Sequence, residues 1–166
     1  MRIRKSGPYR GSHIPVLAKL LSLTTGPVLE LGSGFYSTTF LHWMCFPTRR
    51  KLVTYENNTE WMGFAKQFKA DFHDVIFVDD WDKIDISCPW SIAFIDHAPN
   101  ERRGMEVRRL RHADYLVLHD TERGVIRRYN YLSARRFYKY KWQYVDGLKP
   151  YTSIWSDKFD VTGLSI

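Results

Sequence analysis

Residues 28–38 read Val-Leu-Glu-Leu-Gly-Ser-Gly-Phe-Tyr-Ser-Thr, and they decide how the rest of the chain is interpreted. An apolar run contains an acid, two glycines follow, and a helical pattern begins near Ser37. This order predicts a buried strand, a tight turn and a helix N-terminus, the geometry that brings a backbone close to a nucleotide. A second predicted strand, 51–56, ends in Glu56, and an acid about 20 residues after the glycines is suited to a ribose diol.

These two strand ends resemble the class I S-adenosylmethionine-dependent methyltransferases, which have an acid-x-Gly-x-Gly motif and a second acid after the next strand. The resemblance implies that Gly32 and Gly34 pass close to the methionine part of the cofactor. It also implies that Glu30 lies near the cofactor's amino group and that Glu56 holds the ribose hydroxyls. Tyr36 stands where many members have a third small residue, and this departure disfavours NAD. The expected cofactor-binding residues are Glu30, Gly32, Ser33, Gly34, Tyr36, Ser37, Thr38, Glu56, Asn57, Asp79, Asp80, Trp81 and Asp96.

Apolar strands alternate with helical patterns along the chain. The expected strands cover 28–32, 51–56, 74–78, 91–95 and 113–118. The expected helices cover about 12–23, 36–46, 59–70, 100–111 and 123–136, with Ser12 and Thr59 near the first and third N-caps. Residues 79–90 have no helical period, so a helix there is missing or reduced to a turn.

This alternation predicts a Rossmann-like α/β fold, doubly wound around a mostly parallel sheet. Two alternating aromatic segments, 138–144 and 151–156, predict a closing antiparallel hairpin through Asp146 and Gly147. The hairpin brings the sheet to seven strands, and the methyltransferase fold also ends in one. We expect residues 1–166 to form a single methyltransferase domain, in which 1–13 are a basic N-terminal arm that serves as a lid.

The composition indicates a globular cytoplasmic protein. Of 166 residues, 44% are hydrophobic, which is enough for one packed core and excludes a disordered chain. The two cysteines, Cys45 and Cys88, are expected to be reduced thiols. There is no apolar run of about 18 residues and no signal-peptide core, so we expect no membrane partner.

A net charge of +7 predicts an anionic partner. Between Glu101 and Lys141, twelve Lys and Arg residues stand against five acids. Two interpretations remain open for this segment: the arginines form solvated helix faces, or they form a basic rim around the substrate site that includes Arg102 and Arg103.

All five predicted parallel strands end in acids or acid–histidine pairs. Because ligands bind beyond the carboxyl ends of such strands, we expect a functional rim there. Asp80 or Asp79 suits the exocyclic amine of adenine, and Trp81 suits its ring face, although Trp81 fits a core position equally well. The strand-end residues are Glu30, Glu56, Asp79, Asp80, Asp96, His97, His119 and Asp120.

The last two strand ends read Ile-Asp-His-Ala-Pro over 95–99 and His-Asp-Thr over 119–121. They are similar to small-molecule O-methyltransferases related to catechol O-methyltransferase and to the sugar and antibiotic methyltransferases. This resemblance implies that Asp96 and Asp120 serve catalysis and could hold Mg²⁺ or another divalent cation. Thr121 stands where the metal-binding members have Asn, which leaves the cation open.

Without a metal, His119 or His97 is the candidate general base, with a neighbouring Asp to orient its ring. The predicted activity is direct methyl transfer from S-adenosylmethionine to a hydroxyl of a small or anionic acceptor. Segments 2–13 and 82–90 are expected to contact that acceptor, whose identity stays open, as does the oligomeric state.

Two alternatives remain. Asp-His-Ala-Pro at 96–99 is similar to a segment of RNA ribose 2′-O-methyltransferases, but their lysine after the fifth strand is replaced by His119-Asp120. Nucleic acid is therefore a second candidate partner. The basic, aromatic segment 127–144 also fits a cofactor- or nucleic-acid-binding module without catalysis.

Overall fold

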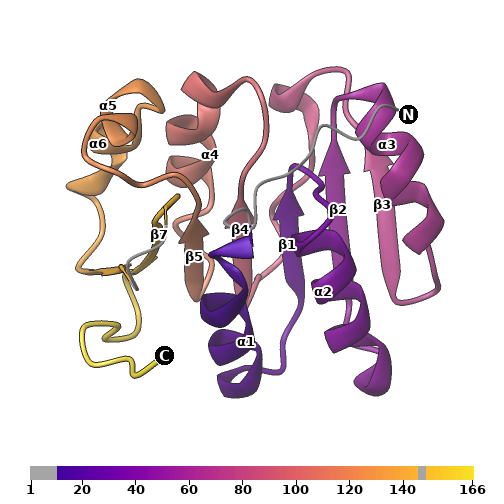
Figure 1. The fold of residues 1–166 in the computed structure, drawn as a ribbon, viewed down its shortest axis with the longest axis horizontal. Helices are drawn as coiled ribbons and strands as arrows, with labels where there is room; N and C mark the ends of the chain where they lie inside the picture. Colours follow the sequence, from indigo (N-terminus) through magenta and orange to yellow (C-terminus); the bar gives the residue numbers. More distant parts are fainter. Residues whose placement is uncertain (1–10, 146–148) are drawn as a thin grey trace.

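A seven-stranded sheet runs through the middle of the computed structural model, which describes residues 11–145 and 149–166 (Figure 1). The strand order is β3-β2-β1-β4-β5-β7-β6, with β1 to β5 parallel and β7 antiparallel to both neighbours. The predicted Rossmann-like sheet with its closing hairpin is confirmed. The strands are β1 (Val28–Leu31), β2 (Leu52–Glu56), β3 (His73–Phe77), β4 (Ile92–Ile95), β5 (Tyr115–Leu118), β6 (Tyr140–Tyr144) and β7 (Thr152–Ser156).

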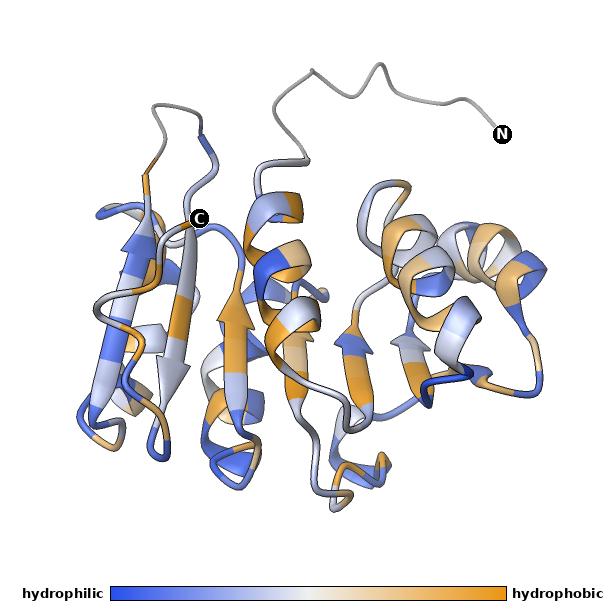
Figure 2. Cartoon of the chain, turned by 90° about the horizontal axis from the view of Figure 1, so that it is seen from below, coloured by the Kyte–Doolittle hydropathy of each residue, from blue (hydrophilic) through white to orange (hydrophobic). Residues whose placement is uncertain are grey.

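Helices cover both faces of the sheet, which is why its inner strands are buried along their whole length. In Figure 1, α1 and α2 lie in front of the strands, and Figure 2 shows hydrophobic residues concentrated on the central strands. One face carries α1 (Ile14–Leu23), α2 (Ser37–Cys45) and α3 (Thr59–Ala65). The other carries α4 (Arg103–Arg109), α5 (Val125–Arg128) and α6 (Tyr131–Arg135).

Successive residues of each strand enter opposite cores. On β1, Leu29 and Leu31 pack towards α4, whereas Val28 packs towards α1 and α2. Because side chains alternate along a strand, Glu30 points to the same side as Val28. An acid is therefore placed inside the α1–α2 core, a position that requires polar partners.

The chain reverses its direction across the sheet between β1 and β4. Strands β2 and β3 extend to one side of β1, and β4 and β5 lie on the other side. The carboxyl ends of β1 and β4 therefore form the topological switch point, where open α/β sheets bind their ligands.

Some predicted elements differ in detail from the structure. The prediction of one helix over 123–136 is wrong, because Asn130 adopts a left-handed conformation (φ 57°) that separates α5 from α6. The carbonyl of Asn130 lies against Gly104 of α4, where a Cβ would be 2.3 Å from it. The predicted turn over 79–90 is confirmed as one 3₁₀ turn, Trp81–Lys83.

The predicted N-cap of α1 is also corrected. The hydroxyl of Ser12 donates to the carbonyl of Pro150 (2.5 Å), so it does not cap α1. Thr59 lies next to the N-cap of α3, as predicted, and the cap itself is Asn58, whose side chain accepts the amides of Glu60 and Trp61.

The expected turn through Asp146 and Gly147 and residues 1–10 of the expected arm lie outside the described part of the chain. Among residues 11–145 and 149–166, no helix has both the length and the apolar character needed to cross a membrane.

Candidate active site

The loop after β1 packs directly on the chain that leaves β4. Gly32 has a φ of +90°, and a Cβ there would lie 2.5 Å from the Cα of His97. Such a clash with backbone excludes any other residue without a rearrangement. Gly34 differs, because the nearest atom to a Cβ there would be the Ser37 hydroxyl at 3.2 Å. The fold itself thus requires Gly32, whereas a small residue at 34 leaves space above the loop.

Glu56, at the end of β2, is bonded to this loop. Its carboxylate accepts the Ser33 amide (2.7 Å), the Ser33 hydroxyl (2.8 Å) and the Asn58 amide (2.7 Å). The Gly34 amide donates in turn to the hydroxyl of Thr38 (3.0 Å), on the first turn of α2. The predicted ribose-binding acid and the glycine loop therefore form one hydrogen-bonded unit.

Glu30 lies beneath the loop and has no exposed surface. The hydroxyls of Thr38 (2.9 Å) and Thr54 (2.7 Å) donate to its carboxylate. Burial raises the pKa of Glu30 to about 7, although Ser37, Thr54 and Thr38 partly offset this. In this arrangement Glu30 supports the loop from below and does not reach the space above it.

The polar contacts continue from Glu30 across the α2–β3 layer. Nε2 of His73 lies 2.8 Å from the Thr54 hydroxyl, and Nδ1 of His73 lies 3.1 Å from Nδ1 of His42. Burial lowers the pKa of His73 to about 4 and that of His42 below its usual value, so both rings are neutral. Neutral histidines join a buried acid to α2 without adding a buried charge.

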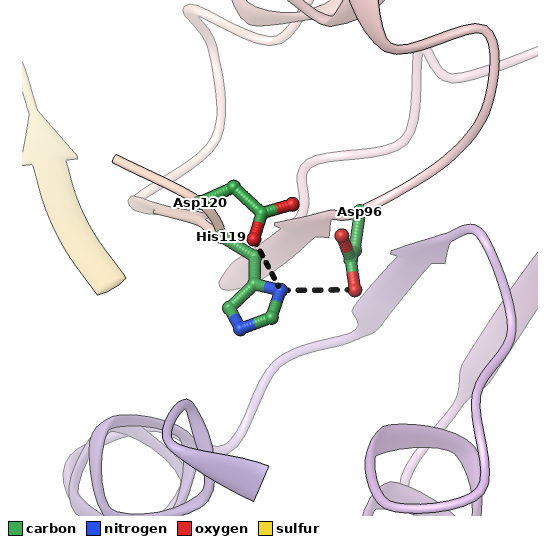
Figure 3. A group of neighbouring side chains, drawn as sticks. All are labelled: Asp96, His119 and Asp120. Atoms are coloured by element: carbon green, nitrogen blue, oxygen red, sulfur yellow. Dashed lines mark hydrogen bonds and ion pairs between the residues drawn. The ribbon is translucent and has the colours of Figure 1, made fainter. Parts of the chain in front are cut away.

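Asp96, His119 and Asp120 converge at the carboxyl ends of β4 and β5 (Figure 3). Nδ1 of His119 lies 3.1 Å from Oδ2 of Asp96 and 3.7 Å from Oδ1 of Asp120. Burial alone would raise the pKa of Asp96, but His119 and Arg103 outweigh it and hold this pKa well below its usual range. Burial opposes the charge on His119, yet Asp96 and Asp120 raise its pKa above the usual value.

The start of α1 covers the other side of His119. The hydroxyl of Ser12 lies 3.4 Å from Nε2 of His119, and the ring of His13 stands edge-on to His119, 4.9 Å between centroids. His13 is buried, and burial lowers its pKa to about 3. Neither of its ring nitrogens has a hydrogen-bond partner within the described chain.

His97 is placed in the opposite layer from α1. Its Nε2 lies 3.4 Å from the carboxylate of Glu106 on α4, and both side chains are fully buried. The Trp81 ring packs against the His97 ring, tilted by 32° with 4.2 Å between centroids, and donates its indole N–H to the carbonyl of Ala98 (3.0 Å). Both residues thus contribute to the α4 core, with Trp81 95% buried.

The remaining predicted cofactor residues are half-buried or exposed, and they follow β2 and β3 or, for Tyr36, precede α2. Asp80 accepts the Asp82 amide (3.0 Å) and pairs with Lys83, and Asp79 is exposed. Asn57 is half-buried after β2, and Tyr36 is exposed, with its ring against Gly11. Their positions follow the predicted strand ends, but their side chains do not contact the Asp96–His119 pair.

Arg103 does not lie on a solvated helix face, which was one of the two interpretations of the basic segment. It is 96% buried between the ends of β4 and β5, at the predicted edge of the site. Its guanidinium pairs with Asp96 (2.9 Å) and Asp120 (3.1 Å), and the Tyr129 ring lies 4.7 Å away. The 3₁₀ turn before α4 brings it there, and periodicity alone gave no signal for this.

Other arginines of the basic segment are also engaged. Arg102 pairs with Asp82 and Glu106, and Arg109 donates to the carbonyls of Trp81 and Ile84. The exposed arginines of this segment are Arg108, Arg111, Arg123, Arg127, Arg128, Arg135 and Arg136.

Comparison by sequence finds no matching protein family and no matching curated protein. Solved structures are similar in fold. Cofactor-bound Rv0187 from MTB is 19% identical with a TM-score of 0.64, over 96% of this chain and 84% of that one. The O-methyltransferase TomG from Streptomyces achromogenes, in complex with SAM, is 18% identical with a TM-score of 0.63, over 91% and 81%. The METTL16 MTase domain is 12% identical with a TM-score of 0.63, over 92% and 69%.

The chain has the class I S-adenosylmethionine-dependent methyltransferase fold. At these identities the likeness extends to the order and packing of the elements. Within this fold, the Gly32 loop and the Asp96–His119 pair both occupy the switch-point edge of the sheet.

We predict that Glu30→Gln removes a pH-dependent loss of stability. The folded-state pKa of Glu30 is raised from 4.5 to about 7, so folding binds a proton in this window. The contribution of Glu30 to the free energy of unfolding should therefore be fully present below about pH 4.5 and fall by roughly 3 kcal/mol as the pH rises through 7. Urea unfolding of both proteins from pH 4 to 8 measures this difference.

The matched control for Glu30 is Glu101→Gln, since Glu101 is exposed. A difference between native and Glu30→Gln unfolding free energies that stays constant with pH would contradict the prediction.

Proposed function

We propose that this protein is an S-adenosylmethionine-dependent methyltransferase that methylates a hydroxyl group of a small or anionic acceptor. The observation that carries the proposal is the Asp96–His119 pair beside the Gly32 loop. A base for a hydroxyl and a glycine loop for a nucleotide then lie at one edge, where a bound methyl donor and acceptor would meet.

The loop residues fit the cofactor. Glu56 already accepts the hydroxyl of Ser33, and a ribose diol offers the same kind of donor to the same carboxylate. The space above Gly34 suits close backbone approach, and Glu30 holds the loop through Thr38. When bound, the cofactor supplies an activated methyl group on a sulfonium, so transfer needs alignment and no covalent enzyme intermediate.

His119 is the proposed general base. Its Nδ1–H faces the Asp96 carboxylate, which orients the ring, and its Nε2 faces the Ser12 hydroxyl, which would have to give way to the acceptor. The Ser12 hydroxyl donates to Pro150 and therefore can only accept from Nε2. Both ring nitrogens of His119 therefore face hydrogen-bond acceptors, which favours a doubly protonated ring in the resting protein, in keeping with its raised pKa. His119 must lose one of these protons before it can act as a base.

We predict that Gly34→Ala weakens binding of S-adenosylhomocysteine at least about tenfold, equivalent to ~1.4 kcal/mol. The added methyl requires only a shift of a few tenths of an ångström by the Ser37 hydroxyl, 3.2 Å away, but it takes the space above the loop. Titration calorimetry measures the affinity, and the melting temperature should change little. Gly32→Ala is the comparison variant, and it should lower the melting temperature because its Cβ meets backbone.

Native protein that binds no S-adenosylhomocysteine would refute the cofactor assignment. Undiminished binding by Gly34→Ala would show that the backbone at 34 does not approach the ligand.

We predict that Asp96→Asn lowers the rate of methyl transfer by about 10²-fold or more and keeps cofactor affinity within a few-fold. The rate of the native enzyme should rise with pH through a pKa above about 6.5, the usual histidine value. Asp96 raises the pKa of His119, so its loss should move this rising limb to lower pH. Rate profiles from pH 5 to 10 measure both effects.

Asp160→Asn, on the exposed C-terminal segment, is the control for these profiles. An unmoved limb in Asp96→Asn would remove His119 as the base, and an equal loss of cofactor affinity would assign Asp96 to the cofactor site.

The proposed acceptor is anionic because exposed arginines follow the end of β5. Arg123, Arg127 and Arg128 lie within nine residues of His119 and are exposed, whereas Arg103 is buried. We therefore propose these three arginines, in place of Arg102 and Arg103, as the basic edge of the site. Attraction by exposed charges is screened over about 10 Å at ~0.1 M salt.

We predict that the KM for the acceptor rises gently with salt and that Arg127→Ala with Arg128→Ala flattens this rise. Arg135→Ala, exposed on α6, is the control and should leave the slope unchanged. A steep linear fall of the logarithm of the acceptor affinity with the logarithm of the salt concentration, with a slope of about −0.7 to −0.9 per phosphate contacted, would instead favour the nucleic-acid acceptor. Turnover that ignores salt would show that these arginines are only a solvated face.

A further inference from the structure

Two carboxylates meet at the switch-point edge and require a cation between them. Ligand atoms of Asp96, Asp120 and His119 all lie within 4.8 Å of one another (Figure 3). Oxygen-rich groupings of this kind suit Mg²⁺ or Mn²⁺. At such distances the repulsion between two carboxylates in a poorly solvated site is large, so a positive group must accompany them.

The positive group is already supplied by the chain. The two terminal nitrogens of Arg103 divide between the acids, with Nη2 2.9 Å from Asp96 Oδ1 and Nη1 3.1 Å from Asp120 Oδ2. The guanidinium is held by further acceptors, the carbonyls of His97 (2.7 Å) and Asp96 (3.0 Å) and the side chain of Asn100 (3.1 Å). Its planar fork is thus bonded on every nitrogen, and the ring of Tyr129 lies over it.

Thr121, the next residue that could bind a divalent cation beside the two acids, is engaged in other hydrogen bonds. Thr121, beside Asp120 in sequence, is buried and donates its hydroxyl to the carbonyl of Tyr151 (3.2 Å). The same hydroxyl accepts from Ser153 (2.9 Å) and Gln143 (3.0 Å). The residues present therefore do not fit a divalent cation while Arg103 remains in place.

We propose that Arg103 is a built-in cation that replaces a divalent metal between Asp96 and Asp120 and positions Asp96 against His119. This inference rests on the proposed function only where it concerns the rate of methyl transfer. That the guanidinium of Arg103 occupies the place of a cation between Asp96 and Asp120 does not depend on the reaction.

The decisive experiment measures Mn²⁺ binding by electron paramagnetic resonance and calorimetry in the native protein and in Arg103→Ala. The native protein should bind no Mn²⁺ at this site. Arg103→Ala should gain one Mn²⁺, with a dissociation constant of about 10⁻⁵–10⁻³ M, and Mn²⁺ should raise its melting temperature. Arg103→Ala combined with Asp120→Asn should lose this binding, and Arg108→Ala, exposed on the same helix, should behave as the native protein.

If Arg103→Ala does not fold, Arg103→Met replaces it in the Mn²⁺ measurements, because Met fills most of the same volume without the charge. Mn²⁺ bound by the native protein and lost in Asp120→Asn would overturn the proposal. A folded Arg103→Ala or Arg103→Met that binds no Mn²⁺ would overturn it as well.

A rate measurement tests the positioning role separately. Native turnover should be unchanged by a chelator, and Mn²⁺ should restore part of the rate lost in Arg103→Ala. Arg103→Lys should shift the pH profile of the rate, because a single ammonium cannot bond both acids as the fork does. A chelator-sensitive native rate or an unshifted Arg103→Lys profile would overturn the positioning role. Failure of the proposed function would leave no rate to measure, whereas the Mn²⁺ result would still stand.

Discussion

The approach of Gly32 to the backbone of His97 is the constraint on which the site depends. It joins the loop after β1 to the end of β4 with no room for a side chain between them. Glu56 then ties that loop to β2, and the Asp96–His119 pair follows on the other side. The Gly32 loop and the Asp96–His119 pair thus share one edge because two strand ends touch there.

Each buried charge near this edge is compensated in a different way. Glu30 has only neutral hydroxyls as partners, and its burial outweighs them and makes it easier to protonate, whereas Asp96 is paired with His119 and Arg103 and stays ionised. The acid beneath the Gly32 loop therefore supports that loop through Thr38, and the acid at the end of β4 retains its charge and orients the ring of His119. Environment, and not residue type, divides two carboxylates into these roles.

The strands, their order of appearance and the acidic strand ends were predictable from the sequence because buried strands and glycine turns are local patterns. The partners of these residues were not. Nothing in the spacing of Arg103 distinguishes it from Arg108, yet one is buried between two acids and the other is exposed. His97 also follows a strand end, but its pairing with Glu106 depends on how α4 packs, which is a tertiary contact. The division of α5 from α6 at Asn130 has the same origin.

The left-handed turn at Asn130, which separates α5 from α6, constrains which residues can stand at position 104. Gly104 follows Arg103 directly, and its bare Cα faces the carbonyl of the left-handed Asn130. A larger residue at 104 would push the start of α4 away from that turn and draw the guanidinium out from between the acids. Selection on the site would consequently fall on a position that has no side chain at all, and homologues should retain glycine there wherever the arginine is kept.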